Sequence, residues 1–111
     1  MRGEPRDAVG EFAVQVEHVG ERLLVEVIGE LDLLTTPALT QAVPDVPLGG
    51  HCVIDLREVP FMDSTAVHAL IAVHQRACDE GWTLAILRVP GSLVDRLLEH
   101  CGMSARVELL G

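Results

Sequence analysis

The chain has 111 residues, 49% of them hydrophobic, and its eight Lys and Arg residues stand against seventeen Asp and Glu residues, for a formal charge of -9. This length suits one domain with one core. The acidic balance disfavours nucleic acid and anionic membranes as partners, because like charges repel. We therefore expect no direct nucleic-acid binding. The acidity serves solubility or steers the protein toward a basic protein surface.

Residues 1–9 are polar and charged, so we expect a flexible leader followed by one domain over residues 10–111. No stretch resembles a signal peptide or a membrane helix, which predicts a cytoplasmic protein without membrane insertion. Cys52, Cys78 and Cys101 are an odd number without CxxC spacing, and each lies in an apolar run. All three are therefore expected as reduced thiols in the core.

The chain then begins with a predicted antiparallel hairpin. Apolar residues alternate from Phe12 to Val16, a turn around Gly20 follows, and residues 23–28 read as the second strand. Next, Thr36 followed by Pro37 is typical of a helix start with the threonine as N-cap.

A short apolar run at residues 51–56 has the length of a buried strand, and we expect it at the centre of a sheet. A long helix is predicted over residues 64–80, because apolar residues recur at steps of three and four and Gly81 supplies a C-terminal stop. The stripe that we expect to be buried is Val67, Leu70, Ile71, Ala77 and Cys78.

The last part of the chain predicts a strand, a helix and a final strand. Residues 82–87 are apolar and of strand length. Ser92 and Asp95 form a Ser-x-x-Asp sequence, similar to a capping box, before a third helix that Gly102 ends. Residues 105–110 are the last predicted strand. The buried stripe expected for this helix is Leu93, Leu97, Leu98 and Cys101.

The predicted order of elements is therefore β-β-α-β-α-β-α-β, which indicates the α/β class. Helices that alternate with buried strands favour right-handed crossovers onto one mixed sheet. Only the first hairpin then contributes antiparallel pairing.

The segment from Asp63 to Thr65 is the most informative for function. It places a carboxylate and two hydroxyls where a buried strand has ended and a long helix begins. The N-terminus of a helix has unpaired N–H groups and a partial positive charge, so it tolerates a phosphoryl group on a residue such as Ser64. Asp63 and Ser64 are also common helix caps, and these residues alone do not separate a cap from a modified site.

Four motifs, in order and spacing, give the chain a family resemblance. They are Gly29-Glu30-Leu31-Asp32, Val53-Ile54-Asp55-Leu56, Phe61-Met62-Asp63-Ser64-Thr65, and Gly81 before the fourth strand. With these motifs, over residues 12–110, the chain resembles the STAS-domain family and, within it, the bacterial anti-sigma factor antagonists. The resemblance implies a STAS-like mixed β-sheet with helices.

The resemblance also implies a phospho-switch at Ser64. This serine matches the residue that is phosphorylated in family members by a partner that is both an anti-sigma factor and a serine kinase. The unphosphorylated antagonist binds that partner and frees a sigma factor; phosphorylation breaks the complex, and a phosphatase restores the antagonist. We expect no enzymatic activity, metal or cofactor in the antagonist itself.

The partner-binding surface implied by the resemblance surrounds this serine. Asp32 and Asp63 match acidic positions around the phosphorylation site, and Thr65 is its neighbour. A phosphate adds nearly two negative charges beside these carboxylates, in an interface that must otherwise lose its water. Repulsion would then oppose binding, with little change of fold.

Two residues of the same surface differ from the family pattern. Many members have Gly where this chain has Ala66, and often a small residue where it has His68. We expect the methyl group and the imidazole to crowd the surface that a kinase approaches. His68, four residues after Ser64, is also a candidate contact for a phosphate or a partner carboxylate. A STAS-type scaffold of a transporter or signalling complex, without phosphorylation, is therefore an alternative.

Enzymatic and metal-binding interpretations fit less well. No G-x-S-x-G elbow surrounds the serine, and His68 and His74, on its own helix, are badly placed for a hydrolase triad. His51 and His100 each stand beside a cysteine, but neighbours on a strand point to opposite faces and no paired metal motif exists.

Overall fold

The strands lie in the sheet in the same order as in the chain, β1-β2-β3-β4-β5. The structure is a computed structural model that describes residues 12–111, so the predicted leader, residues 1–9, lies outside the described residues. The strands are β1 (Ala13–Val19), β2 (Arg22–Ile28), β3 (His51–Glu58), β4 (Thr83–Leu87) and β5 (Glu108–Leu110). The helices are α1 (Thr36–Ala42), α2 (Ser64–Glu80) and α3 (Leu93–His100), with a 3-10 helix η1 (Met103–Ala105). The predicted order of elements is confirmed.

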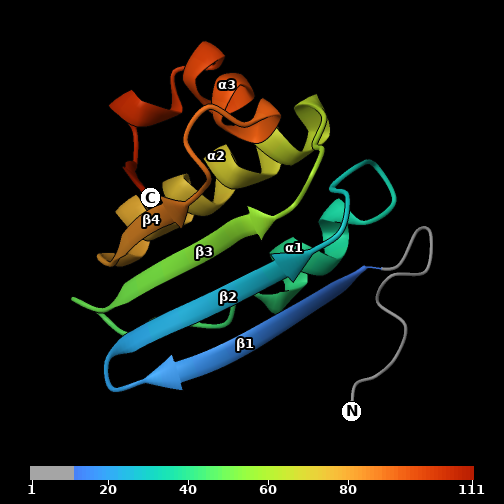
Figure 1. Cartoon of the computed structure of the whole chain (residues 1–111). Helices are drawn as coiled ribbons and strands as arrows, with labels where there is room; N and C mark the ends of the chain where they lie inside the picture. Colours follow the sequence, from blue (N-terminus) through green and yellow to red (C-terminus); the bar gives the residue numbers. More distant parts are fainter. Residues whose placement is uncertain (1–11) are drawn as a thin grey trace.

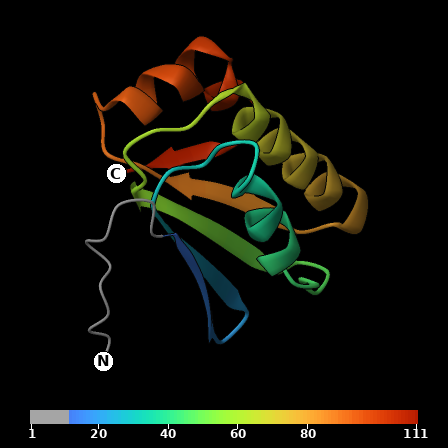
Figure 2. The ribbon, with the colours of Figure 1, turned by 90° about the vertical axis from the view of Figure 1, so that its right-hand side faces the viewer.

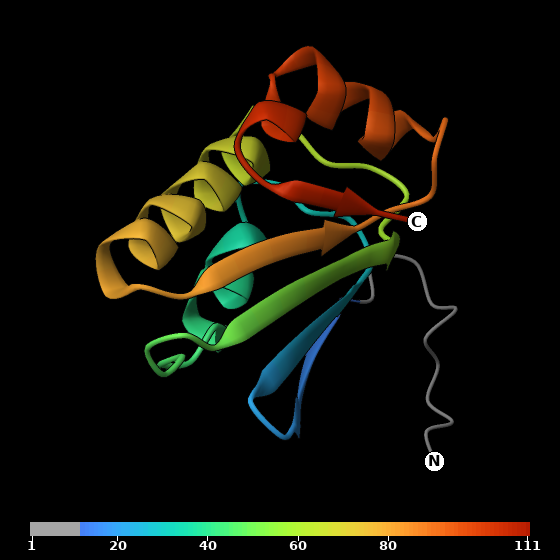
Figure 3. The same ribbon diagram turned by 90° about the vertical axis from the view of Figure 1, so that its left-hand side faces the viewer.

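This strand order explains why the molecule has two layers, a sheet and a layer of helices on one of its faces. β1 and β2 pair antiparallel, whereas β2, β3, β4 and β5 pair in parallel, each with its successor. Every parallel connection steps in the same direction across the sheet, and crossovers of one hand then place all the helices on one face. Figures 1, 2 and 3 show the helices together on one side of the twisted sheet. The predicted mixed α/β sheet is confirmed.

The core fills the space between these layers. Val25, Ile54 and Ile86 lie side by side on β2, β3 and β4, and all three are fully buried. β3 pairs on both sides, as predicted for the central strand. The side of α2 that faces the sheet is made of small and aliphatic side chains, namely Ala66, Val67, Leu70, Val73 and Ala77.

The ends of α2 agree with the signals in the sequence. Asp63 is the N-cap and its side chain accepts a hydrogen bond from the Ala66 N–H. At the other end Gly81 adopts a left-handed conformation with φ of 78°, and its N–H donates to the Ala77 carbonyl. Glycine suits this position because it has no Cβ to clash with the backbone.

The prediction that all three cysteines are buried is wrong for two of them. Cys52 lies in the core, and burial raises the pKa of its thiol to about 11. Cys78 and Cys101 are exposed. Cys78 is one residue, about 100° of helix rotation, past the buried Ala77 and so faces away from the sheet. Cys101 comes after the last residue of α3.

The predicted stripe of α3 is also wrong in part. Val94 and Leu98 are buried, whereas Leu93 is exposed. Ser92 caps the helix by accepting from the Asp95 N–H, as predicted. The Asp95 carboxylate does not complete a capping box with Ser92. It binds Arg88 at 2.9 Å and accepts from the Gly91 N–H, and these contacts restrain the rotation of the helix.

The starts of α1 and of the last strand differ from the sequence prediction. The N-cap of α1 is Thr35, and Thr36 is its first helical residue; Thr36 is buried, and its hydroxyl has no hydrogen-bond partner among the described residues. The last strand begins at Glu108, because residues 103–105 form η1. In residues 12–111, no helix combines the length and the apolar character needed to cross a bilayer.

We predict that Gly81→Ala lowers the free energy of unfolding by about 1 kcal/mol or more, because a side chain is strained in the left-handed region. The added methyl would also meet the Leu48 side chain. Gly91→Ala is the control, since Gly91 has φ of 83° with nothing within 4 Å of an added Cβ. Urea denaturation followed by Trp82 fluorescence should show the larger loss for Gly81→Ala. Equal losses would contradict the contribution of the Leu48 contact.

Candidate functional site

The loops after β2 and β3 lie side by side at the carboxyl ends of these parallel strands (Figure 1). The Leu31 N–H donates to the Phe61 carbonyl at 3.0 Å, and the Asp63 N–H donates to the Leu31 carbonyl at 3.2 Å. Leu31 and Met62 thereby form an isolated parallel bridge beyond the sheet. Since Asp32 follows Leu31 and Asp63 follows Met62, the bridge brings together the two acidic positions predicted from the resemblance.

Asp32 organises the first of these loops. Its Oδ1 atom accepts hydrogen bonds from the Leu34 N–H at 2.9 Å, the Thr35 N–H at 3.0 Å and the Thr35 hydroxyl at 3.1 Å. The Asp32 N–H in turn donates to Thr35 Oγ1 at 2.9 Å, and the single proton of that hydroxyl is shared between Asp32 Oδ1 and the Glu30 carbonyl. This turn closes the loop just before α1 begins.

These bonds favour the ionised form of the Asp32 carboxyl. The Thr35 N–H, the Thr35 hydroxyl and the Leu34 N–H lower its pKa from the ordinary value, although partial burial acts in the opposite direction. Asp32 therefore has a local structural role in addition to its place beside the helix start.

Ser64 is the first residue of α2 and is exposed. It follows the capping residue Asp63, whose Oδ1 atom accepts from the Ala66 N–H at 3.3 Å. The first N–H groups of a helix have no carbonyl partner within it, so a group attached to the Ser64 hydroxyl would lie in a favourable field for negative charge. Thr65 is half-buried and the Ser64 hydroxyl is the more accessible of the two.

The two positions that differ from the family pattern lie on opposite sides of α2. Ala66 is fully buried and belongs to the core. Its methyl group therefore does not crowd the surface around Ser64, contrary to what the sequence suggested. His68 is exposed, one turn beyond Ser64, as predicted. Of the two departures, only His68 changes the accessible surface.

An exposed apolar patch that sequence reasoning missed lies on the same two loops. Leu33 is 70% exposed, Leu34 86% and Phe61 46%. We call these three residues the apolar patch. The sequence signal for this patch was the pair of leucines between Asp32 and Thr35. A turn this short contains no strand or helix that could bury the two side chains.

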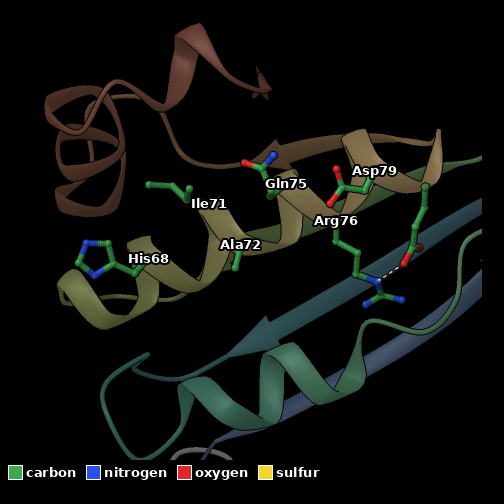
Figure 4. Close-up of a pocket in the computed structure, with 7 residues that line it drawn as sticks. His68, Ile71, Ala72, Gln75, Arg76 and Asp79 are labelled. Atoms are coloured by element: carbon green, nitrogen blue, oxygen red, sulfur yellow. Dashed lines mark hydrogen bonds and ion pairs between the residues drawn. The ribbon is translucent and has the colours of Figure 1, made fainter.

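A shallow groove runs along the outer side of α2 and has a volume of about 480 Å³ (Figure 4). His68 lies at one end of it, and Ile71 and Ala72 line its middle. At the other end Arg76 points toward the segment after α1, where its guanidinium donates to the carbonyls of Val43 and Pro44.

The arrangement of serine, histidine and acidic side chains over residues 12–111 decides whether a hydrolytic or metal centre is present. No hydrogen bond among the described residues links Ser64 to a histidine, and His68 is a solvent-exposed neighbour on the same helix. Within residues 12–111, no group of three or more His, Cys, Asp and Glu side chains is placed to hold a metal ion.

The sheet with its helices on one face is a fold found in known proteins. The family model described as Mlab, STAS domain matches residues 14–111. The chain belongs to the STAS-domain family. The resemblance indicated by the four motifs is thus confirmed. Comparison with the sequences of curated proteins gave no match.

Solved STAS-like structures include anti-sigma factor antagonists. One from Mycobacterium paratuberculosis is 26% identical to this chain and has a TM-score of 0.76, with 93% of this chain and 88% of that chain covered. The anti-sigma factor antagonist SpoIIAA, in its unphosphorylated form, has a TM-score of 0.63 at 18% identity, with 89% and 88% covered. These similarities confirm the antagonist-like form of the STAS fold.

We predict that Asp32→Asn lowers the urea midpoint at pH 7, because a neutral amide accepts the three hydrogen bonds less strongly than a carboxylate. The pKa of Asp32 is lowered in the folded protein, so its contribution is present above the unfolded value of about 3.9 and is lost as the pH falls through the folded value. The midpoints of variant and wild type should therefore converge as the pH falls below the unfolded value. Asp79→Asn, at an exposed position of α2, is the control and should show no such pH-dependent difference.

Proposed function

We propose that this STAS-domain protein is an anti-sigma factor antagonist. It binds an anti-sigma factor while Ser64 is unmodified and releases it when Ser64 is phosphorylated. The observation that carries the proposal is the position of Ser64: it is exposed at the start of α2, directly after Asp63, and the Leu31–Met62 bridge ties this loop to the loop of Asp32 and its exposed leucines. The 26% identity to an anti-sigma factor antagonist over 93% of the chain supports the same function.

The apolar patch supplies the attraction in this proposal. Leu33 and Leu34 are held out of the core by the Asp32 turn, and both side chains are mostly exposed. Burying a leucine side chain against a partner contributes roughly 1.5–3 kcal/mol. A partner that offers an apolar pocket with basic groups at its edge would match both the patch and the neighbouring carboxylates.

Phosphorylation would act through charge and hydration. A phosphoryl group on Ser64 adds nearly two negative charges beside Asp63 and Asp32, at a surface that must lose water in the complex. In the free protein the same group lies at the N-terminus of a helix, which stabilises it. Ser64 is exposed, so the modification requires no rearrangement of the core. The switch therefore opposes binding without unfolding the domain.

The proposed cycle needs two further activities, both supplied by partners. The anti-sigma factor is itself the serine kinase that modifies Ser64, and a phosphatase regenerates the antagonist. We place this cycle in the cytoplasm, with no enzymatic step carried out by the antagonist. SpoIIAA, which has the same fold, was solved in its unphosphorylated form.

A STAS-type scaffold that binds its partner constitutively, in a transporter or signalling complex, is the second candidate. The exposed imidazole of His68, one turn from Ser64, favours it, because a kinase must approach this surface. The two functions differ in whether Ser64 is modified in native cells. Peptide mapping of residues 58–76 by mass spectrometry decides between them: phosphate on Ser64 supports the antagonist, and its absence under all growth conditions supports the scaffold.

We predict that Ser64→Asp weakens binding to the cognate anti-sigma factor by at least about tenfold, because a fixed negative charge joins two carboxylates. Ser64→Ala should retain wild-type affinity and resist phosphorylation. Ser104→Asp, at an exposed serine in η1, is the charge control and should bind normally. Isothermal titration calorimetry measures all three. Retention of binding by both Ser64 variants would contradict the switch.

The contribution of the apolar patch has its own test. Leu34→Ser should weaken the same complex by about tenfold or more, since a buried leucine is lost from the interface. Leu48→Ser is a matched control, because Leu48 is 85% exposed against 86% for Leu34 but lies in the loop before β3. Thermal unfolding should show that both variants remain folded. Equal affinities of the two variants would exclude the patch from the interface.

A further inference from the structure

The exposed side of the first turns of α2 brings Ser64 and His68 together. They are four residues apart on a regular helix and both are exposed. Side chains at this spacing lie on the same face, with Cβ atoms about 6 Å apart. Ala66 and Val67 are buried beneath them, so neither residue separates the serine hydroxyl from the imidazole.

The side chains considered around Ser64 and His68 provide more negative than positive charge. In residues 64–71, His68 is the only side chain that can become positive. Asp63 and Asp32, by contrast, place negative charge at the start of the helix. A phosphoryl group on Ser64 would therefore meet repulsion from the preceding loops and one possible counter-ion, on the following turn.

The neighbouring helices α1 and α3 add little net charge around Ser64 and His68. α1, which packs beside α2, has no charged side chain over residues 36–42. On α3, the Asp95 carboxylate is bound by Arg88, while the exposed Arg96 and Glu99 have opposite charges. His100, the remaining titratable group of α3, is exposed at its last turn.

We propose that His68 is the counter-ion of a phosphoryl group on Ser64, which makes the phosphorylated state sensitive to pH. This inference rests on the proposed function only in taking Ser64 as the modified residue. An imidazole ordinarily titrates near pH 6.5 and the second proton of a phosphoserine near pH 6. The ion pair of imidazolium with dianionic phosphate forms in that range and is lost above it, when the imidazole becomes neutral.

The pair has a consequence for the switch. Near pH 6 the imidazolium holds the phosphoryl group against α2 and offsets part of its repulsion by Asp63. At higher pH the phosphoryl group loses this contact and faces solvent with its full charge. Accessibility of the phosphate to a phosphatase therefore increases with pH.

The test uses protein in which phosphoserine is inserted at position 64 during synthesis, so that no kinase is needed. Phosphorus NMR gives the midpoint of the phosphate titration in wild type, His68→Gln and His74→Gln. We expect the midpoint to be about half a pH unit lower in wild type than in His68→Gln, because the imidazolium stabilises the dianion. His74, ten residues after the phosphoserine and half-buried, is the matched control, and its variant should behave as wild type.

A further variant tests whether the positive charge at position 68 is responsible for the shift in the phosphate midpoint. His68→Lys retains a positive charge, so it should restore the low phosphate midpoint that His68→Gln loses. Identical midpoints in wild type and His68→Gln, or equal changes in the two glutamine variants, would overturn the proposal. Either result leaves the proposed function intact, since that function is tested by partner binding of Ser64→Asp and Ser64→Ala.

Discussion

The backbone bridge between Leu31 and Met62 is the constraint on which the site depends. It continues the parallel pairing of β2 and β3 past the ends of the strands and ties the loops that precede α1 and α2. Asp32 and Asp63, which are far apart in the sequence, become neighbours at one edge of the sheet. Ser64 follows directly, so the bridge also fixes the start of α2 relative to the rest of the site. A rigid connection of this kind suits a surface that a partner must recognise in one shape.

The residues of the site both stabilise local structure and determine the charge and apolar character of the surface. Asp63 caps α2, and Asp32 closes the turn before α1, so both carboxylates stabilise local structure while adding negative charge to the surface. The turn made by Asp32 leaves Leu33 and Leu34 exposed. Apolar attraction and acidic charge therefore come from one short segment. A phosphoryl group on Ser64 would change the balance between them through electrostatics, with no need for a second conformation.

The order of the strands places this surface at the carboxyl ends of the parallel strands. Because each crossover steps to the next strand, the carboxyl ends of β2, β3 and β4 lie next to one another and their loops form a continuous border of the sheet. The helices cover one face, as Figure 2 shows, and Leu33, Leu34 and Phe61 on this border are exposed. Ligand and partner sites commonly lie at the carboxyl edge of parallel strands, where loops can vary without disturbing the core.

The sequence by itself determined the order of elements, the length of α2, the Asp63 cap and the Gly81 stop. These features depend on periodicity and on capping groups a few residues away, and such local interactions can be recognised along the chain. Only the tertiary structure decided that Ala66 is buried, that Cys78 is exposed and that the loop with the exposed Leu34 is tied to the loop before Ser64. Exposure depends on the rotation of each helix against the sheet and on which loops the parallel strands bring together, and residues distant in the chain set both.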